Sequence, residues 1–172
     1  NENLNQLKYK IVVNDVSQNG KRFKSDPTEF DIELQQRVDN YLIPNWYPTD
    51  RMPEGDESRR NDKFGYTHIH HFYSKRALIA LSAIYSKLKT NYQKFLFTSI
   101  ISMRCTNRMP YRPGGKSAGT VNNLNLPSII QEYNVFDTII RKARQIYEAF
   151  NEEKNKVSLS KKGKVVVSIN SV

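Results

Sequence analysis

Three histidines, at positions 68, 70 and 71, are the residues whose types and spacing point most directly to chemistry. Histidine is the commonest transition-metal ligand, and Cys105 could add a further ligand or form a nucleophilic Cys–His pair with one of these rings. The nearest carboxylate is Asp62, and Cys105 is far away in sequence, so the four donors of a structural zinc site are not gathered. We therefore expect structural or hydrogen-bonding histidines, a buried Cys105, and no metal site.

Two further stretches resemble catalytic or cofactor-binding motifs but do not match them. RPGGKSAGT (112–120) lacks the spacing of a phosphate-binding loop, and no apolar strand leads into it. Its glycines are better suited to bringing the backbone close to a phosphodiester. IPNWYP (43–48) has separated prolines and no strand before it, unlike an Asp-Pro-Pro-aromatic catalytic motif. We therefore predict neither catalytic nor cofactor-binding residues in this chain.

The charge pattern points to a polyanionic partner. The net charge is +10, and residues 63–131 contain ten Lys and Arg and no Asp or Glu, while the remaining 17 basic side chains balance all 17 acidic ones. Ordinary protein surfaces intersperse both signs. The basic residues are not gathered on one amphipathic helix, which favours nucleic acid over a membrane surface. The predicted DNA-binding residues are Arg51, Arg59, Arg60, Lys75, Arg76, Arg104, Arg108, Tyr111, Arg112 and Lys116.

Within this set, two regions are interpreted separately. Arg104, Arg108, Arg112 and Lys116 are evenly spaced along a loop of prolines and glycines, which we expect to contact DNA. The stretch 43–56 has two interpretations: a proline-stiffened segment with Trp46 held in the core, or a surface that contacts nucleic acid through Arg51, Arg59 and Arg60.

The elements that must position these residues follow from periodicity and turn signals. An alternating run at 8–14, a turn at 17–20 and a short strand at 21–23 predict a hairpin, and KVSLSKKGKVVVSIN (156–170) predicts a second one. Asp26-Pro27 predicts a helix start before the stripe Phe30, Leu34, Val38 and Leu42. Residues 43–66 are expected to be a long ordered loop, and 67–73 one helical turn.

Further helices are predicted after Ser74, over 91–104 and after Asn134. The nearly apolar segment 95–101 is expected at the centre of the core. The sequence therefore predicts an α+β fold: a mainly helical core with small β-hairpins near the N- and C-termini and long ordered loops. A chain of 172 residues is expected to form a single domain over 1–172.

A specific run of residues resembles a known family. IPNWYPTDRMPEGDESRR followed by GYTHIHHFYSKRALIALSAIYSKL, over 43–88, is similar to the central region of bacterial site-specific DNA methyltransferases of the adenine-specific, DNA methylase N-4/N-6 type. PSIIQEYNVF (127–136) follows the family more loosely. The resemblance implies a target-recognition or DNA-binding insert of an enzyme that uses S-adenosylmethionine. The family's Phe-x-Gly-x-Gly and Asp-Pro-Pro-Tyr motifs are absent from the sequence, which implies no cofactor in this fragment and no activity alone.

These observations define the expected partners and the alternatives. The chain begins with NENLNQ, without Met or a secretion signal, and is expected to be a piece of a larger methyltransferase. Its partners would be double-stranded DNA and the catalytic domain of the same parent chain, with no membrane. One cysteine and no long apolar run fit a cytoplasmic protein. The alternatives are a self-standing RNA-binding module that stacks bases on Phe64, Tyr66 and Tyr111, and an inert packing domain.

Overall fold

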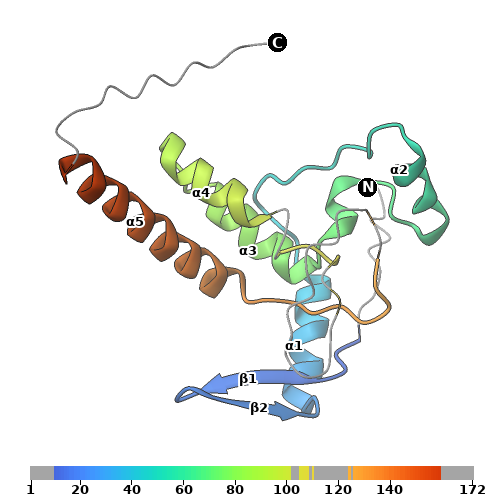
Figure 1. Ribbon diagram of the computed structural model, residues 1–172. Helices are drawn as coiled ribbons and strands as arrows, with labels where there is room; N and C mark the ends of the chain where they lie inside the picture. Colours follow the sequence, from blue (N-terminus) through green and yellow to red (C-terminus); the bar gives the residue numbers. More distant parts are fainter. Residues whose placement is uncertain (1–9, 102–104, 109, 111–123, 125, 160–172) are drawn as a thin grey trace.

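The computed structural model describes residues 10–101, 105–108, 110, 124 and 126–159. Within this part of the chain the fold is α+β, with five α-helices, two short 3-10 helices and one two-stranded antiparallel hairpin (Figure 1). Figure 1 shows α3, α4 and α5 lying together, with α1 and the hairpin at one end of this group. The predicted α+β class is confirmed.

The N-terminal hairpin pairs β1 (Asn14–Gln18) with β2 (Lys21–Ser25). Asn19 and Gly20 close it with φ angles of 51° and 75°, as expected for an Asn-Gly turn whose two central residues are left-handed. This turn fixes the register, so pairing starts at Gln18 and Lys21 and ends at Asn14 and Ser25. The predicted strand at 8–14 is therefore wrong over 10–13, which precede the paired residues.

Helix α1 (Glu29–Asn40) begins at a capping box and not at the predicted Asp26-Pro27 start. The Thr28 hydroxyl accepts a hydrogen bond from the Asp31 amide, and the Asp31 carboxylate accepts one from the Thr28 amide at 2.8 Å. The same carboxylate accepts from the Asn14 side chain at 2.9 Å, which attaches the hairpin to the helix. Hydrogen bonds from Thr28 and Asn14 lower the pKa of Asp31. None of the α1 side chains is buried, and Leu42 of its predicted stripe lies beyond the helix end.

The segment between α1 and α3 is more regular than predicted. Residues 43–55, here called the strap, are irregular except for a single bridge at Arg51, but α2 (Asp56–Arg60) and the 3-10 helix η1 (Asp62–Phe64) follow. The predicted helical turn within 67–73 is confirmed as η2 (Ile69–Phe72). The strap pairs with the chain just before η2 through the Met52 amide to the Thr67 carbonyl, 2.9 Å, and the Ile69 amide to the Asp50 carbonyl, 3.0 Å.

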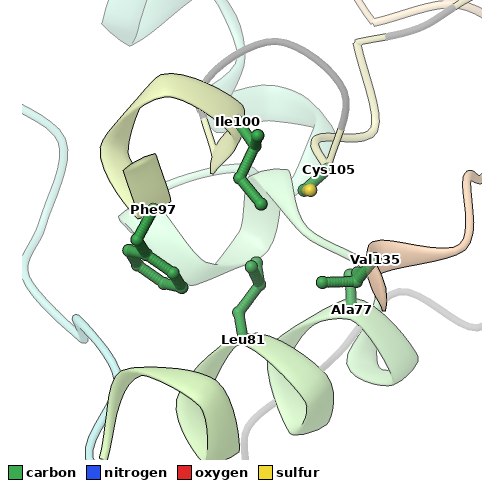
Figure 2. Packing of buried hydrophobic residues seen from close by; sticks show 6 residues of the cluster. All are labelled: Ala77, Leu81, Phe97, Ile100, Cys105 and Val135. Atoms are coloured by element: carbon green, nitrogen blue, oxygen red, sulfur yellow. The ribbon is translucent and has the colours of Figure 1, made fainter. Parts of the chain in front are cut away.

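The core lies where α3 (Lys75–Tyr85), α4 (Asn91–Ile101) and the start of α5 (Val135–Leu159) meet. Figure 2 shows its buried side chains converging: Ala77, Leu81, Phe97, Ile100, Cys105 and Val135. The three predicted helices are confirmed, with the Ser74 hydroxyl capping α3 by accepting from the Ala77 amide at 3.1 Å. Phe97 and Ile100 of the predicted central segment are buried, whereas Phe95 is exposed.

Two predictions are wrong: the start of the C-terminal hairpin and the burial of Trp46. Lys156–Leu159 continue α5, so they do not form the first arm of a C-terminal hairpin; extending a helix adds one hydrogen bond per residue, which outweighs a short alternating pattern. The remainder of that predicted hairpin lies outside the described residues. Trp46 is not held in the core: 65% of it is exposed, and its ring lies against Tyr85 at the end of α3 and not among the buried side chains.

Leu81 and Leu42 offer a matched test of this core. Leu81 is 6% exposed inside the cluster, whereas Leu42 is 89% exposed. We expect Leu81→Ala to lower the free energy of unfolding by about 2–5 kcal/mol, because it leaves a cavity. Leu42→Ala should change it by no more than about 0.5 kcal/mol. Urea denaturation of both variants measures this, and equal effects would show that the helices pack differently.

Candidate nucleic-acid interface

Two of the predicted DNA-binding residues meet at one carboxylate. Asp62 receives Arg51 Nη2 at 2.9 Å and Arg59 Nη1 at 3.1 Å on the same oxygen, Oδ2. Arg59 also donates to the Met52 and Pro53 carbonyls and lies 3.5 Å from Glu54. A guanidinium has five donors in a planar fork, so one side chain can satisfy several strap groups at once. Arg59 therefore joins the strap to the start of η1.

The other predicted cations in the described part of the chain also have intramolecular contacts. Arg60 pairs with Glu57 one turn earlier in α2. Lys75 donates to the Asp39 carbonyl at the end of α1. Arg76 donates to Gln35 at 2.9 Å and lies 3.6 Å from Glu132. These contacts link α1, the start of α3 and the segment before α5.

The basic loop is only partly described. Arg108 is half-buried, and its positive charge counteracts the rise that burial causes in the pKa of Tyr73. Arg104, Tyr111, Arg112 and Lys116 lie outside the described residues. Their assignment to DNA contact stays a prediction.

A different group of cations has no intramolecular partner within the described residues. Lys87, Lys89 and Lys94 are exposed on residues 85–95, here called the lysine tip, which runs from the end of α3 into α4. Tyr92 on the same segment is 82% exposed. These lysines belong to the acid-free segment, but they are not among the residues predicted from the sequence to bind DNA. The spacing of these lysines around Tyr92 is the sequence feature that could have indicated a binding surface. The helical periodicity on either side of Tyr92 favoured assigning the segment to core helices instead.

A groove of about 1580 Å³ runs between α1, the start of α3 and the segment before α5. Its charged lining residues are evenly divided in sign: Lys10, Lys75, Arg76, Arg141 and Arg144 against Asp15, Asp31, Asp39, Glu132 and Asp137. A polyanion gains little net attraction in a groove of balanced charge. The groove is therefore a weaker candidate for DNA contact than the lysine tip.

The histidines form a packed cluster with structural contacts. The His70 and His71 ring centroids are 4.4 Å apart, and His68 lies 5.2 Å from His71. His71 Nδ1 accepts from the Thr67 amide at 3.1 Å, while His68 Nδ1 contacts the Thr67 hydroxyl at 2.7 Å. Among the described residues, no group of three or more His, Cys, Asp or Glu is arranged to hold a metal ion.

His70 is buried, at 2% exposed, and within the described chain neither ring nitrogen has a hydrogen-bond partner in good geometry. Burial, followed by the charges of His71 and His68, lowers the pKa of His70 to about 4; the Pro48 backbone acts weakly in the opposite direction. Burial also raises the pKa of the Cys105 thiol to about 11. A thiol that stays protonated at neutral pH is a poor nucleophile, so a Cys–His catalytic pair has no support here.

Comparison of the chain with models of protein families, with curated proteins and with solved structures finds no match in any of the three. No helix in the described part of the chain is long and apolar enough to cross a membrane. A function for this chain therefore has to be proposed from its charge pattern and from the positions of its cations and aromatic rings, together with the resemblance expected from the sequence of 43–88.

Arg59 and Arg60 test the structural role of the strap contacts. Arg59→Lys keeps the charge but removes most of the hydrogen bonds to carbonyls and carboxylates, so we expect the free energy of unfolding to fall by about 1–2 kcal/mol. Arg60→Lys keeps the positive charge beside Glu57 in an exposed ion pair and should cost no more than about 0.5 kcal/mol. Urea denaturation of the two variants measures this. Indistinguishable variants would refute the role assigned to Arg59.

His70 predicts a pH dependence of stability. The unfolded chain binds a proton on this residue near pH 6.5, whereas the folded chain does so only near pH 4. The free energy of unfolding should therefore be at its full value above pH 6.5 and fall by about 2–3 kcal/mol as the pH drops to 4. His70→Phe should remove much of this dependence of stability on pH. A smaller dependence should remain, because burial also lowers the pKa of His71. Denaturation at pH 7, 5.5 and 4 measures both proteins; an unchanged slope would contradict the assignment.

Proposed function

We propose that this chain is the DNA-binding, target-recognition portion of an S-adenosylmethionine-dependent DNA methyltransferase that modifies adenine N6 or cytosine N4. The observation that carries the proposal is the 69-residue segment 63–131, which has ten cations and no acid and holds the whole charge excess. Neutralising phosphates and releasing their counterions is the main source of affinity for a protein of this charge. The residues of 43–88 that are similar to the methyltransferase family supply the enzyme class.

The proposal divides the work between this chain and its parent. The cofactor and catalytic motifs of the family are absent from the sequence, so S-adenosylmethionine binding and methyl transfer belong to the catalytic domain of the same parent chain. Double-stranded DNA is the partner, and the cytoplasm is where such an enzyme would meet it. In this scheme Arg51 and Arg59 shape the strap, and the basic loop and exposed lysines contact phosphates.

One observation counts against the RNA-binding alternative. Tyr66 is buried and its ring lies 5.5 Å from Phe72, so it is unavailable for stacking on a base. Phe64 is exposed, with Lys63 over its ring at 5.0 Å. One of the three aromatic residues required by that alternative is thus unavailable.

The basic loop provides the test. Duplex affinity should fall linearly with salt on logarithmic axes, and changing Arg104, Arg108, Arg112 and Lys116 to Ala should reduce the slope by roughly 0.9 for each phosphate that is no longer neutralised. Fluorescence anisotropy with a labelled duplex at several salt concentrations measures it. The control replaces four cations from the charge-balanced flanks, Lys10, Lys21, Arg37 and Lys154. An unaltered slope in the loop variant, or an equal decrease in the control, would overturn the loop assignment.

A further inference from the structure

We infer that the Trp46–Tyr85 ring pair and the lysine tip together form a binding surface for unpaired bases of a DNA strand. The inference rests on the proposed function and adds to it a site and a substrate form. It concerns residues that the sequence pattern had assigned to the core or left unselected.

The aromatic part of the surface is anchored on one side and open on the other. Trp46 and Tyr85 have ring centroids 5.4 Å apart, with an angle of 43° between the rings. Tyr85 in turn lies 5.6 Å from Phe97, which is buried in the core. The contact with Tyr85 therefore positions Trp46 against the helical core, while most of its indole is exposed. An exposed ring that is held in place loses little conformational freedom when a base stacks on it.

The cations of the surface are next to these rings along the chain. Lys87 and Lys89 follow Tyr85 by two and four residues, and Lys94 precedes Phe97 by three. Within the described residues these lysines have no partner, in contrast to Arg51, Arg59 and Arg76, which contact carboxylates of the chain itself. A nucleic-acid backbone that runs past the rings would meet free ammonium groups, each able to neutralise a phosphate.

Exposed aromatic rings together with lysines that are unpaired within the described residues favour an unpaired strand over other partners. Bases within a duplex are stacked on each other and present only their edges in the grooves, so their faces cannot reach Trp46. Lysine is depleted in protein–protein interfaces, whereas three free lysines beside exposed aromatic rings are typical of single-strand binding. A methyltransferase that turns a base out of the helix creates such unpaired bases locally.

Trp46 provides a direct signal because it is the only tryptophan in the chain. Titration of the 172-residue chain with an oligothymidylate of about fifteen nucleotides should quench its fluorescence saturably. Trp46→Ala should weaken binding, followed by anisotropy of labelled oligonucleotide, about fivefold or more, and Trp46→Phe should retain most of the affinity. Tyr147→Ala removes a similarly exposed ring, at 69%, from α5 and should leave binding unchanged.

The lysines are tested by salt dependence. Changing Lys87, Lys89 and Lys94 to Ala should lower the slope of log affinity against log salt by roughly 0.7 for each phosphate of a single strand that is no longer neutralised. Changing Lys21, Lys24 and Lys154 to Ala removes the same charge elsewhere and should leave the slope unaltered. Circular dichroism of each variant confirms that it is folded.

The outcomes separate this inference from the proposed function. Duplex binding that persists without any Trp46 quenching by oligothymidylate would overturn the surface and leave the proposed function standing. Absence of binding to both duplex and single strand would overturn both. Binding to oligouridylate that is tighter by about tenfold or more would contradict the assignment to DNA. If Trp46 instead becomes protected from iodide as the protein concentration rises, the surface is a contact between copies of the chain, and the inference is wrong.

Discussion

Packing of Leu81, Phe97, Ile100 and Val135 is the contact on which the rest of this structure depends. These side chains come from the consecutive helices α3 and α4 and from α5, which begins much later in the sequence, and Cys105, just after α4, completes the cluster (Figure 2). Burial of apolar surface is the main favourable term in folding, and α3, α4 and the start of α5 share this cluster. Tyr85, whose ring contacts both Trp46 of the strap and Phe97, connects the strap to this cluster. Tyr73, which follows η2 and its histidines, packs against the same cluster.

Beyond the core, polar contacts order the chain. The strap and the following turns contain few buried apolar side chains, and their geometry is set by Arg59, by Asp62 and by the backbone pairing of Met52 with Thr67. Partly buried charge-assisted hydrogen bonds are stronger than exposed ion pairs because less solvent competes for the donors. The use of arginine at position 59 therefore has a structural reason that does not require a nucleic acid.

The distinction between engaged and unengaged cations changes how the net charge is interpreted. A count of basic residues treats Arg59 and Lys89 as equivalent, although one contacts its own chain and the other is exposed without a partner in the described residues. An exposed cation such as Lys89 contributes more readily to binding a polyanion, since no contact within the described chain has to break first. For this reason the proposed contact with nucleic acid is placed at the lysine tip and Trp46.

The sequence by itself determined the α+β class, the three core helices, the Ser74 cap and the helical turn before it, because these depend on local periodicity and local hydrogen bonds. It also determined the acid-free segment. Only the tertiary structure decided where Trp46 lies, since an aromatic residue among prolines has no periodicity to assign it to a face. The same holds for the continuation of α5 through Leu159 and for which cations are engaged. Those features depend on contacts between segments that are distant in sequence or on competition between helix and strand, and neither is encoded in a short pattern.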